Sequence, residues 1–479
     1  MSLTSDDLRA LAQSDEADGV WVVGGAVRDR LIGQTSRTQE LDLAVSSGEA
    51  WAQSAAAALD ASCVGISAAF PIWRIVRHGQ TLADVWRLDE DLATDLRRRD
   101  FSVNAMAVPL SDFADGDVRA NLIDLHGGQR DLAQRRLRLV SDSALIDDPL
   151  RVLRAVRFEC ELGLRPDAQL RSAMRQAAAG LPNVASERIA AEIQRIFASN
   201  QLPWSLRRLE QCGALGQLFP ELEHCRKVDQ RPVHRRDVFW HQYDAVRWIT
   251  RLTDHDAPRG KYARQLWAVL AALRSDDAIR RTLDEWRLPL RLATLFHDIG
   301  KPATKEVGAD GRTRFYGHSE LGAELAEARL RSLRFPSWVT EQVQLLIEQH
   351  LRPGQVASPG QAPTDRALHR FHTALGDAAA PLCWLFLADS LATAGPRALL
   401  PRWPAYAAHV TRILNWQPRR STAEPRLLDG REIMAAAGIG PGPQVGVIQR
   451  EIDERAAIGK IRTAEEARQL ARTLATTPA

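Results

Sequence analysis

Residues 20–45 constrain this chain more than any other stretch, because two strand-like runs there flank a glycine pair and a helix. Val20–Val23 is apolar, and Gly24 and Gly25 separate it from a predicted helix that carries Arg28. Glycines where a strand turns into a helix let backbone N–H groups approach a phosphate closely, and a helix N-terminus favours negative charge. The sequence therefore predicts a phosphate-binding turn at Gly24 and Gly25.

The second strand-like run of this stretch ends in Glu40-Leu41-Asp42-Leu43-Ala44-Val45. Residues two apart on a strand point to the same side of the sheet. Glu40 and Asp42 are therefore expected to present two carboxylates opposite the phosphate-binding turn. Two carboxylates facing bound phosphates are suited to Mg²⁺.

This order of strand, Gly-Gly, Arg28 and carboxylate pair resembles the polymerase-beta-type nucleotidyltransferases. Among them it is similar to bacterial tRNA CCA-adding enzymes and their poly(A) polymerase relatives, and the resemblance covers nearly the whole chain. It implies addition of CMP or AMP to the 3′ end of tRNA from CTP and ATP, without a nucleic acid template. The chain has Glu40-x-Asp42 where the family pattern is Asp-x-Asp.

The resemblance implies a third carboxylate, and Asp84 occupies the matching position. Phe70–Val76 and Thr81–Trp86 are predicted strands joined by the turn His78-Gly79. On this interpretation Asp84 is a general base or metal ligand that helps to deprotonate the attacking 3′-hydroxyl. The alternative is a solvent-facing aspartate on an edge strand.

A charged run from Asp95 to Ala107 resembles the family's RRDF-x-x-NA element. The resemblance implies that Arg98, Arg99, Asp100 and Asn104 hold the sugar and triphosphate of the incoming nucleotide. Guanidinium groups suit phosphate oxygens because each can donate two hydrogen bonds at once; the alternative is a solvated helix face. The connection from Asp84 to Arg98 is short, as in relatives that add only CC, whereas enzymes that add the full CCA usually carry a longer loop.

Asp147–Phe158 is predicted to open a helix with Pro149 near its start, and Asp148 and Arg151, three residues apart, are expected on one face of it. An acceptor and a donor side by side can pair with the edge of a base. The stretch resembles the family's EDxxR amino-acid template, which selects CTP and ATP, and Arg154 lies one turn further on. A surface ion pair is the alternative.

The second half of the chain carries histidines and aspartates in an order that resembles the HD phosphohydrolase superfamily. These residues are His241, His297, Asp298, His318, His350 and Asp389. The resemblance implies a divalent transition metal such as Ni²⁺, Mn²⁺ or Co²⁺, for which imidazole and carboxylate are suitable ligands. It also implies hydrolysis of phosphoesters.

The fold class expected is α+β: a polymerase-beta-type nucleotidyltransferase head, then an all-α neck and body with an HD domain. The predicted divisions are residues 1–140 for the head, 141–228 for the neck and body, 229–400 for the HD domain and 401–479 for a helical tail. The net charge is only +3, but local arginine clusters predict a surface that faces tRNA.

The remaining composition predicts a cytoplasmic protein. The five cysteines form no C-x-x-C pair, as is usual for reduced packing residues. The acidic N-terminal residues do not have the pattern of a signal peptide, and no apolar run is expected to span a membrane. Within the nucleotidyltransferase interpretation, a CC-adding enzyme and a poly(A) polymerase are alternatives. A different class also stays open, namely an HD phosphohydrolase whose head only binds RNA.

Overall fold

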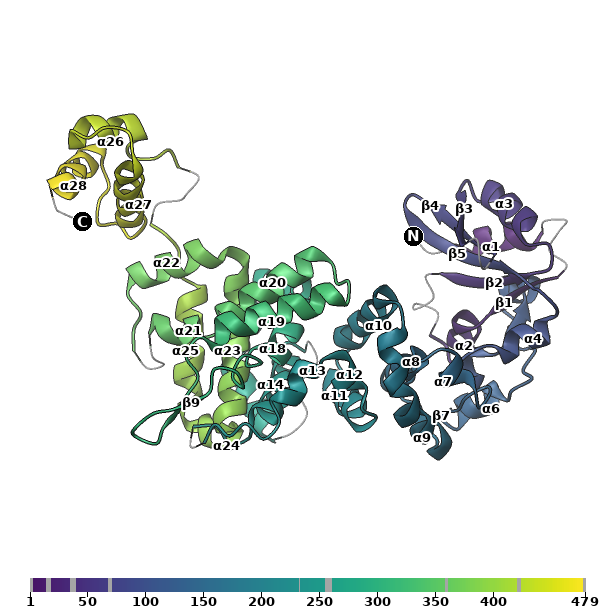
Figure 1. Cartoon of the computed structure of the whole chain (residues 1–479). Coiled ribbons are helices and arrows are strands. Elements are labelled where there is room, and N and C mark those ends of the chain that lie inside the picture. Colours follow the sequence, from purple (N-terminus) through teal and green to yellow (C-terminus); the bar gives the residue numbers. More distant parts are fainter. Residues whose placement is uncertain are drawn as a thin grey trace. The chain divides into compact units, whose positions relative to one another are not determined.

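The computed structural model describes residues 3–13, 19–34, 40–67, 71–231, 233–254, 261–357, 361–419 and 424–476. The chain divides into two compact units, Met1–Leu218 and Phe219–Ala479 (Figure 1). The first unit combines a sheet with helices, and the second is built almost entirely of helices. The expected α+β class is confirmed.

A six-stranded sheet forms the centre of the first unit, in the order β3-β4-β5-β2-β1-β6. The strands are β1 (Val20–Val23), β2 (Leu41–Val45), β3 (Ser62–Ser67), β4 (Ile72–Arg77), β5 (Gln80–Arg87) and β6 (Ala107–Pro109). Strands β2 and β5 run parallel, with Asp42 paired to Asp84. Alternate apolar side chains of the central strands, such as Leu43 and Val85, are fully buried.

Helix α3 (Glu49–Ala58) covers part of this core and buries Trp51. The predicted hairpin turn is confirmed: His78 and Gly79 have φ values of 50° and 75°. Two successive residues with positive φ match the right-handed twist of paired strands. Phe70, the first residue of the expected strand, lies outside the described residues, and β4 begins at Ile72.

Strand β3 was not predicted from the sequence. Its residues include two serines and Gly65, which have weak preference for strands. Pairing with β4 therefore outweighs the local preference of this segment.

Apart from a second sheet of two short parallel strands, β7 (Arg136–Leu137) and β8 (Arg165–Pro166), the rest of the first unit is mostly helical. Its helices are α1 (Ser5–Ala12), α2 (Gly25–Leu31), α4 (Leu92–Arg97), α5 (Leu110–Asp115), α6 (Gly128–Ala133), α7 (Ala144–Asp147), α8 (Arg151–Glu161), α9 (Ala168–Ala177), α10 (Ser186–Ala198), α11 (Leu202–Gln211) and α12 (Ala214–Leu218). The helix predicted to open near Pro149 is α8, which starts at Arg151, but Asp148 is not part of it and has an extended backbone after the end of α7. Pro149 lacks an N–H for a continuous helix.

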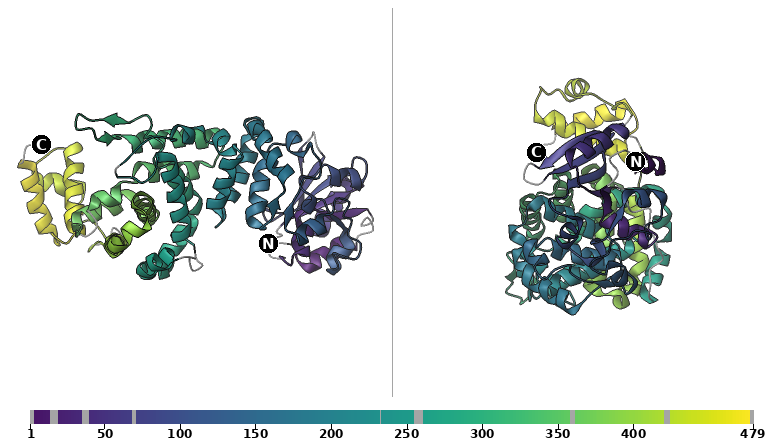
Figure 2. Two further views of the ribbon diagram at one scale, coloured as in Figure 1. Left: turned by 90° about the horizontal axis from the view of Figure 1, so that it is seen from below. Right: turned by 90° about the vertical axis from the view of Figure 1, so that its right-hand side faces the viewer.

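The second unit packs long helices around an apolar interior, and Figure 2 shows these helices from two further directions. Its main helices are α14 (Val238–Leu252), α18 (Arg287–Phe296), α19 (His318–Ser332), α20 (Ser337–Glu348), α22 (Asp365–Leu375), α23 (Ala379–Ala394) and α25 (Trp403–Leu414). Three later helices, α26 (Gly430–Ala437), α27 (Pro443–Ala457) and α28 (Ala464–Thr476), share a small core of their own.

One helical stretch of the described residues, Asp365–Ala394, is long and apolar enough to cross a membrane by length and composition. It consists of α22, a 3₁₀ turn and α23. Because 67% of its apolar window is buried inside the protein, packing in the core accounts for this composition.

Candidate functional site

Two carboxylates lie side by side at the centre of the head sheet. Asp42 on β2 pairs in register with Asp84 on β5, and both side chains are half-buried. Burial raises the pKa of Asp42, the charges of Asp84 and Glu40 raise it further, and Arg99 and Arg154 act in the opposite direction. A bound divalent cation would favour the ionised form of Asp42, and carboxylate oxygens are the ligands that Mg²⁺ prefers, so this pair fits the Mg²⁺ that the fold family implies.

Glu40 is not on the strand, contrary to the sequence prediction. It forms an exposed bend immediately before β2. The neighbouring strand β1 ends at Val23, which pairs with Asp42. No residue of β1 is therefore left to pair with Glu40. The charge of Glu40 still acts on Asp42 and on Arg74.

Arg74 on β4 binds the third carboxylate and was not predicted. Its Nε and Nη2 atoms donate to the two oxygens of Asp84 at 2.8 Å each. Strand β5 lies between β4 and β2, so Asp84 is not on an edge strand as the alternative reading required. A β-bulge at Ile75 and Val76 brings Arg74 opposite Asp84, and this shift was not visible in the sequence.

Gly24 lets the backbone approach these carboxylates. Its φ is +76°, and a Cβ atom there would lie 2.9 Å from Nη1 of Arg99 and 3.2 Å from Oδ2 of Asp42. Any other residue would therefore displace a charged side chain of the site. The following residue, Gly25, begins α2, as expected for a phosphate-binding turn at a helix start.

A buried chain of hydrogen bonds links α2 to the RRDF-like element and to α8. Arg28 Nη1 donates to Asn104 Oδ1 at 2.6 Å, and Asn104 Nδ2 donates to Asp100 Oδ1 at 3.0 Å. Arg154 Nε donates to the other oxygen of Asp100 at 2.7 Å. Burial would raise the pKa of Asp100, but Arg154 and Asn104 hold it below its ordinary value. These four predicted residues thus form one rigid network that supports the site.

The two arginines of the same element differ in their surroundings. Arg99 donates to Asp95 at 3.0 Å and lies over the Trp86 ring, with 5.1 Å between Cζ and the centroid. Arg98 is exposed, and its nearest carboxylate is that of Asp89 at 3.5 Å. Arg98 is therefore the more available cation for a phosphate.

The proposed template pair, Asp148 and Arg151, is held by other partners. Arg151 Nε lies 4.0 Å from Asp148 Oδ2, and its terminal nitrogens donate to the carbonyls of Arg98 at 2.7 Å and Ala144 at 3.1 Å. Asp148 instead accepts from Arg188 Nη2 at 2.7 Å. The pair is therefore not an isolated surface ion pair, because Arg151 connects α8 to the nucleotide-binding element. Arg188 on α10 was not predicted from the sequence.

In the second unit, the six residues of the expected HD set converge. His241 Nε2 lies 3.2 Å from His297 Nε2 and 3.0 Å from Asp389 Oδ1. Asp298 approaches His241 with one oxygen, at 3.4 Å, and His318 with the other, at 3.5 Å. Two overlapping groups can each hold a metal ion, and both include Asp298: one with His241 and His297, the other with His318 and His350.

The histidines are oriented by backbone carbonyls. The Nδ1 atoms of His297, His318 and His350 lie 2.9, 2.7 and 2.7 Å from the carbonyls of Thr294, Phe315 and Ile347. This leaves each Nε2 facing the centre, as metal-ligating histidines require. Burial lowers the pKa of His350 to about 4, which keeps this imidazole neutral and able to bind a metal.

Three further residues join this cluster. Lys301 Nζ lies 2.7 Å from Asp298 Oδ2 and donates to Gln230 at 2.8 Å. His234 Nδ1 lies 3.4 Å from His241 Nδ1. Lys301 follows the His-Asp pair by three positions, a spacing visible in the sequence, whereas nothing in the sequence marked Gln230 or His234.

Comparisons with known proteins show which family the chain resembles. Family models match for the poly A polymerase head domain at residues 70–138, a probable RNA and SrmB-binding site of polymerase A at 163–225, and the HD domain at 266–394. The chain is 34% identical to an A-adding tRNA nucleotidyltransferase of Deinococcus radiodurans, covering 94% of both chains. It is also 34% identical to a CC-adding tRNA nucleotidyltransferase of Thermus thermophilus, covering 93% of this chain and 91% of that one.

Among solved structures, the fold matches a Thermotoga maritima CCA-adding enzyme complexed with tRNA. The TM-score is 0.58 at 20% identity, and the match covers 98% of this chain and 94% of that chain.

Proposed function

Because the chain belongs to the tRNA nucleotidyltransferase family, we propose that it adds CMP or AMP to the 3′ end of tRNA from CTP or ATP. The observation that carries this proposal is the registered pair Asp42 and Asp84 beside Gly24. Glu40 and Asp42 would hold Mg²⁺, which when bound neutralises charge on the triphosphate. Asp84 orients the 3′-hydroxyl and accepts its proton, and two hydrogen bonds from Arg74 hold this carboxylate in place before substrate binds.

Addition of the two C residues is the more specific reaction that we propose. The connection from Asp84 to Arg98 forms the end of β5 and the short helix α4, which Asp91 caps by accepting from Thr94 N at 2.7 Å. A compact, capped connection of this kind supports a CC-adding enzyme. A-adding and CC-adding relatives are equally identical to this chain, so the choice depends on this local feature.

The test is single-nucleotide addition to three tRNA transcripts, ending before the first C, after the first C and after the second C. We expect CTP to extend the first two and ATP to extend the third weakly or not at all. Efficient ATP addition to the transcript ending in CC, with no use of CTP, would instead assign A addition. Repeated ATP addition to any RNA would indicate a poly(A) polymerase.

Substituting Arg151 by alanine should weaken discrimination between CTP and ATP more than it slows addition of the preferred nucleotide. Arg151 connects α8 to the nucleotide-binding element through the carbonyl of Arg98, and a base-pairing contact is worth about 1–3 kcal/mol of discrimination. The ratio of kcat/KM for the two nucleotides measures this. Arg195→Ala, an exposed change on α10, is the control, and unchanged selectivity in Arg151→Ala would remove the template role.

Binding of tRNA should weaken steeply as salt increases, because Lys and Arg contacts to phosphates release counterions. Filter binding across a salt series would give the slope of log K against log salt. A slope near zero would exclude a tRNA-binding surface dominated by phosphate contacts.

For the second unit we propose a divalent transition-metal centre, Ni²⁺, Mn²⁺ or Co²⁺, held by the six histidines and aspartates and hydrolysing phosphoesters. The donor set of imidazoles and a shared Asp298 supports this proposal. We also propose that the protein works in the cytoplasm, and that the four-part division at residues 140, 228 and 400 describes its functional parts.

A further inference from the structure

We propose that a hollow in the second unit binds a nucleotide through its phosphate and base, either free or as one residue of an RNA strand. The hollow has a volume of about 310 Å³, at the lower end of the range for small-ligand pockets. Its chemically distinctive lining residues are Arg235, Arg236, Arg247, Trp248, Arg251 and Tyr262. None of them belongs to the candidate metal centre, so the inference stands apart from the proposed function.

Positive charge in this hollow exceeds negative charge. Among the lining residues that the structure describes, Asp244 is the only carboxylate, and it pairs with both Arg236 at 3.0 Å and Arg247 at 2.9 Å. Within the part of the chain that the structure describes, Arg235 and Arg251 form no ion pair. Burial and the charge of Arg247 lower the pKa of Arg251. An anion in the hollow would relieve this repulsion, and guanidinium groups bind phosphate by paired hydrogen bonds.

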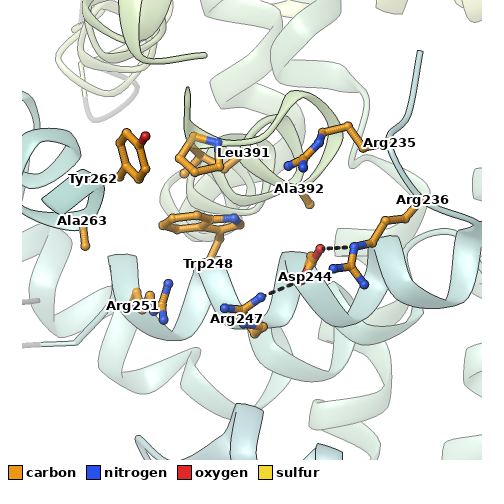
Figure 3. Close-up of a pocket in the computed structure, with 11 residues that line it drawn as sticks. Arg235, Arg236, Asp244, Arg247, Trp248, Arg251, Tyr262, Ala263, Leu391 and Ala392 are labelled. Carbon is orange, nitrogen blue, oxygen red and sulfur yellow. Dashed lines mark hydrogen bonds and ion pairs between the residues drawn. The ribbon is translucent and has the colours of Figure 1, made fainter. Parts of the chain in front are cut away.

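Two aromatic side chains complete the recognition chemistry. Trp248 and Tyr262 both line the hollow, and Arg251 lies over the Trp248 ring with 5.3 Å between Cζ and the centroid. Figure 3 shows the guanidinium end of Arg235 directed toward the middle of the hollow, with Trp248 below and Tyr262 at the far side. Aromatic rings beside arginines are the usual means of holding a base and its phosphate without reading sequence.

The basic lining continues beyond this hollow. A neighbouring hollow shares Arg235 and Tyr262 and adds Arg397, so there is room for more than one phosphate. Helices α14 and α23, which line the hollow, also carry His241 and Asp389 of the metal cluster. The ligand would therefore bind in the same compact unit as the candidate phosphoester chemistry.

The test starts with metal-free full-length protein and 8-azido-AMP, which labels residues close to a bound base. We expect the label on peptides that carry Trp248 or Tyr262, in addition to any label in the head. Label confined to residues 1–218 would overturn the proposal. Competition by AMP, adenosine, inorganic phosphate and tetra-adenylate then identifies the ligand, and adenosine competing as well as AMP would contradict a phosphate-binding role.

Variants locate the contacts. Arg235→Ala should weaken AMP competition for the labelled peptide about tenfold, and Trp248→Ala at least about fivefold, from the loss of a charge-assisted bond and of base stacking. The matched controls are Arg312→Ala and Trp338→Ala, which remove exposed side chains outside the hollow. Equal effects of the hollow variants and the control variants would overturn the proposal.

The competition experiment also identifies the ligand. Binding of tetra-adenylate at least tenfold tighter than binding of AMP would assign an RNA strand, and equal affinity would assign a free nucleotide.

Discussion

Replacing Asp42 by asparagine should abolish nucleotide addition, with a fall in rate of about 10³-fold or more. Asparagine keeps the size of the side chain but removes the charge that a divalent cation and its triphosphate require. Loss of several kcal/mol of charge stabilisation in the transition state corresponds to this factor. Single-turnover addition of CMP to truncated tRNA, with Mg²⁺ or Mn²⁺, measures the effect.

The control for this substitution is Asp115→Asn, at the exposed end of α5, which should leave addition unchanged. Glu40→Asp should preserve or raise activity, since it restores the family's Asp-x-Asp pattern. Full activity of Asp42→Asn would contradict the assignment of the catalytic carboxylates. A wild-type protein that extends no truncated tRNA would leave only the HD phosphohydrolase with an RNA-binding head.

Regular local patterns carried most of the fold prediction. Val20–Val23 forms β1 with the expected bounds, and the predicted strand Thr81–Trp86 lies within β5. In each case a short run rich in apolar residues becomes a strand with buried side chains. The hairpin turn at His78 and Gly79 was also predictable, because a two-residue turn needs positive φ values and glycine adopts them readily.

Contacts that depend on pairing between segments could not be predicted. Arg74 faces Asp84 only because a bulge shifts the register of β4 against β5. Glu40 lies outside β2 because the neighbouring strand β1 ends at Val23, and the chain then turns into α2 at Gly24. Arg151 uses its donors on backbone carbonyls of another segment, whereas the sequence spacing suggested a partner within its own helix.

The histidines and aspartates of the HD domain show both what the sequence could predict and what it could not. Residue types and their order in the chain indicated the metal chemistry, but His241 and Asp389 are far apart in the sequence and only the fold brings their atoms to 3.0 Å. The role of Asp298 as the residue common to both metal groups likewise follows from packing of α18, α19 and α20 rather than from spacing.

Substituting Asp298 by asparagine should abolish metal binding and phosphoester hydrolysis in the second unit while leaving nucleotide addition intact. Asp298 is the one residue common to both candidate metal groups, and the head carboxylates belong to the other compact unit. Metal content after dialysis against Mn²⁺, Co²⁺ or Ni²⁺ and hydrolysis of a model phosphodiester are the measurements. Asp277→Asn, an exposed change, is the control, and melting curves check that Asp298→Asn is folded.

The pH dependence of metal binding gives an independent readout of the same substitution. Burial would lower the pKa of His297, but Asp298 and Asp389 raise it to about 10. A metal ligand must be neutral, so wild-type affinity should increase by up to about tenfold per pH unit between about pH 7 and 9, as the metal displaces this proton. Asp298→Asn removes one charge that raises the pKa, so any residual binding should depend less on pH. Unchanged metal content and an unchanged pH slope in Asp298→Asn would contradict the place of Asp298 at the centre of the cluster. Loss of nucleotide addition in a folded Asp298→Asn variant would contradict the independence of the two sites.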